Sequence, residues 1–337
     1  MDMLLYSDLH LREEREDDCL YVLDQIKRIA IERNIVRILN GGDTFNTRGI
    51  IRTRLIHNLY LKYKEWAEAG LIQYILVGNH DQEDKAGKIH PMKIFEEFDN
   101  WRVIDEPYIP VGEKLAFFPY MEQSKVSEAL NGRSWKGYTA FVHWGICGAS
   151  RNDSNIDDDG IPQNWLSGFK AVFSGHYHYR SKLGHINYIG SPLQQSFGEM
   201  GHDKGVLILD TEKNKYEFVP IQGTPKHHEI KVFWENGKAK VTKPKGIGPN
   251  DFVRARVIGD AEQVSKMDRH SLEKSIKCRS IKIEREVQDK SVSRLNIDSK
   301  EIYNTESLMG KYVDFVNTDL NRKKLLKLGK EIVNAPL

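Results

Sequence analysis

Three apolar runs near the start of the chain each end in a short polar motif. The runs cover residues 2–6, 35–40 and 71–77, and the motifs read SDLH, GGDTFN and GNHD. Residues 15–34 and 52–70, which lie between the runs, place apolar side chains every three or four positions, and this spacing predicts two amphipathic helices. Such strand–helix repeats predict a largely parallel sheet with right-handed crossovers. In such a sheet, ligands gather outside the carboxyl ends of the strands, where the three motifs lie.

The rest of the chain predicts a second sheet and two further parts. Shorter strand patterns follow after residue 113, and they indicate a second sheet packed on the first. Gly223 and Pro225 interrupt the pattern and predict a domain boundary, after which strands and one helix over 260–276 form a small α/β unit. Two helical patterns end the sequence. The expected domains are residues 1–225, 226–297 and 298–337.

Composition limits the class of protein. A chain of 337 residues can form two domains without crosslinks, and its three cysteines are far apart, which fits a reducing compartment. The start has no signal-peptide pattern, and no apolar run approaches the ~20 residues of a membrane span. We therefore expect a soluble, cytoplasmic protein without membrane contact.

Charge is distributed unevenly. The net charge is +2, but Lys and Arg outnumber Asp and Glu from Lys226 onward, whereas the reverse holds before it. A basic region can bind a polyanion or can be an ordinary solvated surface, and the sequence leaves both interpretations open.

Two later strand patterns also end in imidazoles. The motif VHWG supplies His143, and SGHYH supplies His176 and His178. Together with the first three motifs they form a set of oxygen and nitrogen donors without a thiolate, which suits Mn²⁺, Fe²⁺ or Zn²⁺. The set is large enough for two ions that share one carboxylate, an arrangement typical of two-metal phosphoester hydrolysis.

The order SDLH, GGDTFN, GNHD, VHWG and SGHYH resembles the calcineurin-like metallophosphoesterase superfamily. Within it, the chain is most similar to the nuclease subunit of SbcCD-type complexes, which include double-strand-break repair nucleases and phage recombination endonuclease subunits. The GDxF pattern at Asp43, the aspartate Asp81 and the segment YIGSPLQQSFGE at 188–199 carry this narrower resemblance.

The resemblance implies a fold, a site and a cofactor. It implies an α/β/β/α sandwich of two packed mixed sheets, with a small α/β capping domain and C-terminal helices. His80 would face the leaving oxygen, and Asp81 would support His80 or a ligand. Asn46 stands where many members have Asp or His, so we do not expect it to be a ligand. Two divalent ions, most simply Mn²⁺, would be held by Asp8, His10 and His178, by Asn79, His143 and His176, and by Asp43 as the bridge.

The same resemblance implies partners. The basic capping unit would contact DNA, and the C-terminal helices would bind an SbcC-type, SMC-like ATPase through their apolar stripe. Helices of the nuclease domain would form a homodimer. Two alternatives stay open, namely a phosphoesterase for small molecules or proteins and a non-catalytic DNA-binding scaffold. The residues expected to contact DNA are Lys243, Lys245, Arg254 and Arg256.

Two other patterns have simpler interpretations. Residues 153–160 resemble the first half of a calcium loop, but Leu166 replaces the final Glu, so we interpret them as a solvated loop. His227 and His228 lack ligand spacing, and we expect them at an exposed strand start.

Overall fold

The computed structural model describes residues 2–84, 87–151, 155–242, 244–287 and 321–333. The chain forms two compact units. The first consists of Met1–Ile230, Lys243–Arg254 and Leu272–Lys282, and the second of Lys231–Thr242, Ala255–Ser271 and Ile283–Leu337. The domain limits expected at residues 225 and 297 remain predictions.

The first unit contains a six-stranded mixed sheet in the order β11-β10-β1-β2-β3-β4. The four strands from β1 to β4 are parallel, while β10 pairs antiparallel with both β1 and β11. The strands are β1 (Asp2–Tyr6), β2 (Arg37–Asn40), β3 (Ile72–Leu76), β4 (Arg102–Ile104), β10 (Gly205–Asp210) and β11 (Lys215–Pro220).

A second, five-stranded sheet of the same unit has the order β5-β6-β7-β9-β8. All neighbours are parallel except β8, which runs antiparallel to β9. The strands are β5 (Leu115–Phe118), β6 (Thr139–Val142), β7 (Ala171–Ser174), β8 (Lys182–Leu183) and β9 (Ile186–Tyr188).

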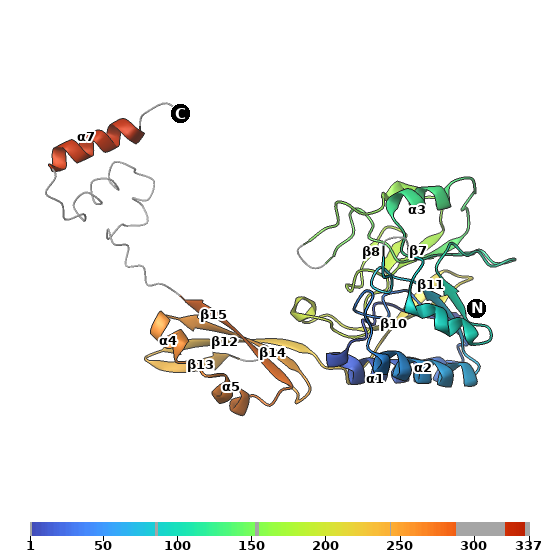
Figure 1. The fold of residues 1–337 in the computed structure, drawn as a ribbon, viewed down its shortest axis with the longest axis horizontal. Helices are drawn as coiled ribbons and strands as arrows, with labels where there is room; N and C mark the ends of the chain where they lie inside the picture. Colours follow the sequence, from blue (N-terminus) through green and yellow to red (C-terminus); the bar gives the residue numbers. More distant parts are fainter. Residues whose placement is uncertain (1, 85–86, 152–154, 243, 288–320, 334–337) are drawn as a thin grey trace. The chain divides into compact units, whose positions relative to one another are not determined.

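Alternating side chains of both sheets build three buried layers. Leu5 of β1 and Phe141 of β6 lie in the core between the sheets. Leu4 packs instead with the helices α1 (Glu16–Glu32) and α2 (Thr53–Glu68), and Val142 packs with α3 (Gln123–Leu130). Because α1 and α2 cover one outer face and α3 the other, the unit is an α/β/β/α sandwich, as expected (Figure 1).

The predicted assignment of all later strands to the second sheet was wrong for β10 and β11. They extend the first sheet, with Met3 opposite Leu209 and Leu4 opposite Ile208. Their alternating side chains fit both faces of that sheet, since Val206 joins the helix-side core and Leu207 the core between the sheets. Sequence patterns also missed β4, β8 and α3, which are short.

A four-stranded sheet follows in the order β13-β12-β14-β15. The single helix predicted over 260–276 is in fact two, α4 (Ala261–Ser265) and α5 (Arg269–Ser275), and α7 (Arg322–Val333) matches the last predicted helix. The helix expected at 299–319 lies outside the described residues. The strands are β12 (His227–Glu235), β13 (Lys238–Thr242), β14 (Phe252–Gly259) and β15 (Ser280–Val287).

Four short 3₁₀ helices complete the described elements. Among the helices of the described residues, none has the length and apolar character that a membrane crossing requires. The four 3₁₀ helices are η1 (Glu13–Arg15), η2 (Pro91–Glu97), η3 (Gln163–Leu166) and η4 (Phe197–Glu199).

Candidate metal centre

The polar motifs of both sheets meet at the carboxyl ends of their strands. β1, β2 and β3 are followed by the SDLH, GGDTFN and GNHD motifs, and β6 and β7 are followed by His143 and by the pair His176 and His178. Their potential ligand atoms lie within 4.8 Å of one another in three groups: Asp8, His10 and His178; His10, Asp43 and His80; and Asp43, His143 and His176.

Asp43 lies between the other ligand candidates. Its Oδ2 is 3.3 Å from His143 Nε2 and 3.8 Å from His10 Nε2. His10 Nε2 is in turn 2.8 Å from His178 Nε2. The arrangement brings the predicted bridging carboxylate between the two predicted ligand sets.

Asn79, the predicted amide ligand, also joins the cluster. Its Oδ1 is 2.9 Å from His176 Nδ1, and its side chain is buried. The structure therefore brings together all seven predicted ligand side chains.

Four of these residues have a strained backbone. Asp8, His10, Asp43 and His176 have φ values of 58°, 48°, 53° and 84°. Residues other than glycine rarely adopt this left-handed region, and such strain concentrates at functional sites. The backbone N–H of Asp8 donates to Gly42 O, and that of His10 donates to Asp43 O, so adjacent loops hold each other in this conformation.

His143 shows how the chain prepares a nitrogen for a cation. Its Nδ1 is 2.7 Å from the carbonyl oxygen of Gly41, which can only accept, so Nδ1 carries the proton. Its Nε2 is buried and has no hydrogen-bond partner among the described residues. A lone pair that is buried beside the Asp43 carboxylate fits a metal ion.

Electrostatics favour the metal-binding forms of His10, His176 and Asp43. Burial, with the neighbouring imidazoles, lowers the pKa of His10 and of His176 to about 3, so both rings are neutral near pH 7. Burial alone would raise the pKa of Asp43, but His143 and the other imidazoles bring it well below its usual range. Neutral imidazoles and an ionised carboxylate are the forms that ligate metals. Against the effect of burial, Asp43 raises the pKa of His143 to about 9 and Glu199 raises the pKa of His178, so metal binding competes with protonation of these two rings.

The two predicted catalytic residues have separate partners. His80 is half-buried, and its Nδ1 is 2.9 Å from the carbonyl oxygen of Asn46. The Asp81 carboxylate accepts from the backbone N–H groups of Phe45 and Gly78, at 2.9 and 3.0 Å. Asp81 thus ties the GGDTFN loop to the GNHD loop, and its hydrogen bonds within the described residues do not reach the His80 ring.

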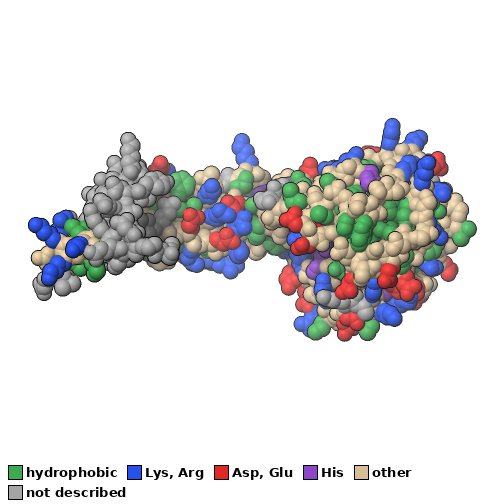
Figure 2. Space-filling model, turned by 90° about the horizontal axis from the view of Figure 1, so that it is seen from above, with side chains coloured by type: hydrophobic (Ala, Val, Ile, Leu, Met, Phe, Trp, Pro, Cys, Tyr) green, Lys and Arg blue, Asp and Glu red, His purple; other side chains and the backbone are tan. Residues whose placement is uncertain are grey.

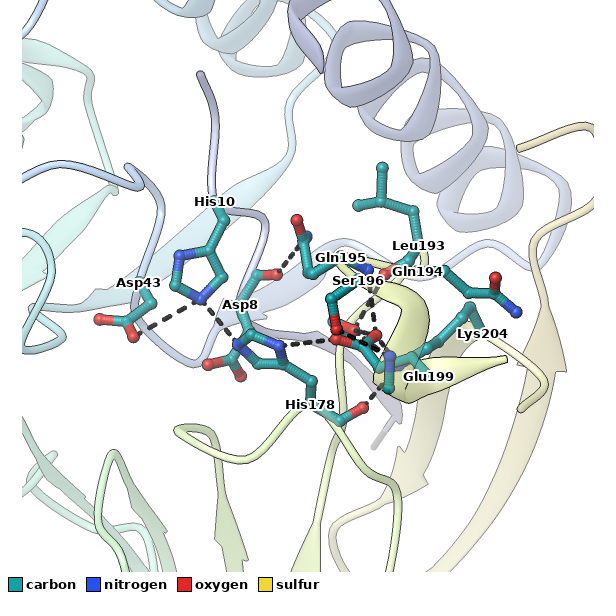
Figure 3. Close-up of polar contacts among 12 residues, drawn as sticks. Asp8, His10, Asp43, His178, Leu193, Gln194, Gln195, Ser196, Glu199 and Lys204 are labelled. Carbon is teal, nitrogen blue, oxygen red and sulfur yellow. Dashed lines mark hydrogen bonds and ion pairs between the residues drawn. The ribbon is translucent and has the colours of Figure 1, made fainter. Parts of the chain in front are cut away.

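A partly buried carboxylate that sequence reasoning missed lies behind His178. Glu199 Oε1 is 3.0 Å from His178 Nδ1, and Glu199 Oε2 is 2.6 Å from Lys204 Nζ (Figure 3). Lys204 also donates to the carbonyl oxygen of His178 at 2.7 Å. Since Nδ1–H donates to the carboxylate, Nε2 of His178 keeps its lone pair for the centre. The sequence signal that could have identified Glu199 is its position as the acidic residue at the end of the segment 188–199.

The predicted DNA contacts occupy different environments. Lys245 is exposed, whereas Arg254 forms an ion pair of 2.9 Å with Glu229 and lies over the Phe197 ring. Arg256 lies on β14, and Lys243 lies outside the described residues. On the face shown in Figure 2, Lys and Arg side chains are interspersed with Asp and Glu.

Two of the simpler interpretations need a correction. The described part of the loop at 153–160 is mostly exposed, as expected, but Asp157 within it is buried and accepts from the Tyr177 hydroxyl and from Arg151 Nη2. His227 is also buried, and its ring packs against Phe197 and Phe252.

An α/β/β/α sandwich with clustered carboxylates and imidazoles at its strand ends defines the class of metal-dependent hydrolases. The family model described as calcineurin-like phosphoesterase matches residues 1–193, and the chain belongs to this family. It is therefore a hydrolase of phosphate esters, and its fold implies divalent metal ions, for which the cluster supplies possible ligands.

Individual relatives extend the likeness along the chain. The chain is 25% identical to exonuclease subunit 1 of Enterobacteria phage T4 over 350 residues, which cover 98% of each protein. It is 30% identical to the putative phosphoesterase 244L of Invertebrate iridescent virus 6, over 61% of this chain and 76% of the relative. It is 29% identical to the DNA double-strand break repair protein Mre11 of Sulfurisphaera tokodaii, over 38% of this chain and 36% of the relative.

Proposed function

We propose that the protein is a metal-dependent DNA nuclease that hydrolyses phosphodiester bonds and acts in recombination or repair. The observation that carries the proposal is the convergence of the seven predicted ligands: six lie in three overlapping groups, two of which contain Asp43, and Asn79 contacts His176 of one group. Two relatives support the nucleic-acid substrate, since one is named an exonuclease subunit and another a DNA double-strand break repair protein.

In this proposal, two divalent ions, most simply Mn²⁺, supply Lewis acidity and activation of water when bound. Asp43 would contribute a carboxylate to both positions. The first position is formed by Asp8, His10 and His178, and the second by Asn79, His143 and His176.

His80 acts on the leaving oxygen. Its Nδ1–H donates to the carbonyl oxygen of Asn46, and this hydrogen bond orients the ring beside His10 with 4.9 Å between ring centroids. With both ring nitrogens protonated, His80 would donate its Nε2 proton to the leaving oxygen while Nδ1–H stays hydrogen-bonded to Asn46 O, and the neutral ring would regain the proton from water. Asp81 keeps the loop that carries His80 in place.

The test compares two substrates with one metal-depleted protein. The protein is stripped with a chelator, supplied with Mn²⁺, Mg²⁺ or Zn²⁺, and assayed on labelled duplex DNA and on p-nitrophenyl phosphate esters. We expect Mn²⁺-dependent DNA cleavage, which His80→Ala lowers by about 100-fold because general acid–base groups contribute about 10²- to 10⁴-fold. His57→Ala, at an exposed position of α2, is the matched control and retains activity.

Two outcomes contradict the proposal. If the protein hydrolyses the p-nitrophenyl esters but cleaves DNA with none of the three metals, its substrate is a small molecule or a protein. DNA binding without metal-dependent hydrolysis of either substrate assigns a non-catalytic scaffold.

We also propose that the protein works in the cytoplasm with partners. The exposed Leu328 of α7 is available for docking of an SbcC-type, SMC-like ATPase, and helices of the first unit form a homodimer. Lys243, Lys245, Arg254 and Arg256 would contact DNA phosphates. A light-scattering mass of one chain at micromolar concentration contradicts the dimer, and unchanged co-purification of an SbcC-type ATPase after deletion of residues 321–337 contradicts the docking site.

A further inference from the structure

Arg12 extends beside the candidate metal centre, two residues after His10. Its Nη1 donates to Gln195 Oε1 at 2.9 Å and to Asn46 Oδ1 at 3.4 Å. Its Nη1 and Nη2 also approach the carbonyl oxygens of His10 and Gln195, at 3.5 and 3.3 Å. Side chains and backbone of three loops of the site therefore fix the position of the guanidinium group.

Within the described residues, the Arg12 side chain forms hydrogen bonds only to neutral groups, while the carboxylates of Glu14 and Glu199 act on its charge without direct contact. Its four acceptors are amide and carbonyl oxygens, and no carboxylate of the described residues forms an ion pair with it. Its neighbour Arg15, in contrast, pairs with Asp18 at 2.5 Å. Arg12 is also half-buried, and a partly desolvated charge without a directly paired counterion is costly. An anion that arrives from solution would remove that cost.

Asn46 connects Arg12 to the chemistry of the site. Its backbone oxygen contacts His80 Nδ1 at 2.9 Å, while its side-chain oxygen contacts Arg12. An aspartate at this position would pair with the guanidinium and neutralise it. The amide orients Arg12 but leaves its charge for a ligand.

We propose that Arg12 binds a phosphate group of the DNA strand that flanks the phosphate being cut. This inference rests on the proposed nuclease function and adds a subsite to it. A guanidinium group suits a phosphate because its planar donors match two phosphate oxygens at once. The contact positions the strand and reads no base, so the subsite is independent of sequence.

The test determines whether the Arg12 side chain contacts one particular phosphate of the substrate. Each phosphate that flanks the cut is replaced in turn by an uncharged methylphosphonate, and kcat/KM is measured with Mn²⁺. For the wild-type protein we expect a loss of about 10- to 100-fold at one flanking position, the size of a charged hydrogen bond. For Arg12→Gln we expect a similar loss on unmodified DNA and a further loss of less than about 2-fold at that position.

Equal methylphosphonate penalties in the wild-type protein and in Arg12→Gln at every position would overturn the subsite. Failure of the proposed function is separate, because the wild-type protein would then cleave no unmodified DNA. A binding assay in chelator gives a second readout. The slope of log Kd against log salt should fall by about 0.9 in Arg12→Gln if one duplex phosphate contact is lost, and an unchanged slope argues against the contact.

Two further variants control for folding. Arg28→Gln removes an exposed arginine of α1 that bonds to Glu32, and it should keep the wild-type methylphosphonate pattern. Arg12→Lys keeps the charge without the planar fork, so it should retain part of the penalty. If the unfolding temperature of Arg12→Gln differs from that of Arg28→Gln, Arg12→Lys replaces Arg12→Gln in the comparison. A full wild-type methylphosphonate penalty in Arg12→Lys shows that the positive charge alone is sufficient for the contact. Loss of the penalty in Arg28→Gln as well overturns the proposal.

Discussion

At the residue scale, ligand candidates are oriented by hydrogen-bond partners that the sequence motifs do not identify. Gly41 fixes the proton of His143 on Nδ1, and Glu199 does the same for His178. Such outer hydrogen bonds hold a ring in the tautomer and orientation that a metal requires. The motifs identify the ligand side chain, and the fold brings close to it the group that orients its ring.

Glu199→Gln tests this arrangement. The substitution removes the carboxylate that accepts from His178 Nδ1, so we expect the affinity for Mn²⁺ to fall by about 10-fold or more. Isothermal titration of the metal-depleted protein measures the change. Glu217→Gln, which alters an exposed carboxylate paired with Arg33, is the matched control.

Lys204 requires a second comparison, because Glu199→Gln leaves its buried ammonium without its carboxylate. The double variant Glu199→Gln/Lys204→Met should recover stability while Mn²⁺ affinity stays low. Recovery of affinity together with stability would show that Glu199 acts only on the fold.

At the element scale, loops after neighbouring strands pack so closely that side chains are excluded between them. A Cβ atom on Gly78, which follows β3, would lie 2.2 Å from Asp43 Oδ1 and 2.3 Å from Asp43 N. The glycine therefore allows the GNHD loop to contact the Asp43 carboxylate directly. His80 N uses this proximity and donates to Asp43 Oδ1 at 2.8 Å.

Gly78→Ala should therefore lower the free energy of unfolding by about 1–3 kcal/mol, the usual cost of overpacking, and weaken Mn²⁺ binding as Asp43 is displaced. Urea denaturation and metal titration measure the two effects. Gly168→Ala is the matched control, since its Cβ would meet Trp135 Cβ at 3.4 Å, an ordinary contact. Similar behaviour of the two variants would contradict a specific role for Gly78.

At the scale of the whole molecule, distant segments share buried contacts within the first unit. The backbone N–H of His227 donates to Gln194 Oε1 at 2.7 Å, and its ring stacks on Phe252 and meets the edge of Phe197. Burial, together with the charge of Arg15, lowers the pKa of His227 from 6.5 to about 4. Packing of this region therefore depends on a neutral imidazole.

The sign of the pH dependence follows from this shift. Below pH 6.5 the unfolded chain takes up a proton that folded His227 does not accept until about pH 4, so folding stability falls as the pH falls through this window. His227→Phe keeps an aromatic ring without the titration. Between pH 7 and 4.5 the wild-type protein should lose about 2 kcal/mol more than the variant. Denaturant unfolding at both pH values measures the difference, and equal losses would contradict it.

Much of the fold and of the centre could be predicted from local sequence. The spacing of apolar residues in 15–34 and 52–70 predicted α1 and α2, and the strand ends with polar motifs named all seven candidate ligands. Prediction failed for β10 and β11, since an antiparallel strand next to β1 and one in a second sheet have the same alternating pattern. It failed for His227 because burial depends on Phe197 and Phe252, which are distant in the sequence.

The sequence by itself determined which side chains stand at the strand ends, since strand period and motif position are local properties. It also determined the chemistry of the donors, because side-chain identity does not depend on packing. Only the tertiary structure decided that Asp43 lies between the two predicted ligand sets, that Glu199 accepts from His178 and that Arg12 forms no ion pair with a carboxylate of the described residues. The contacts join residues up to 183 positions apart, and only the folding of the chain brings their side chains within 3.8 Å of one another.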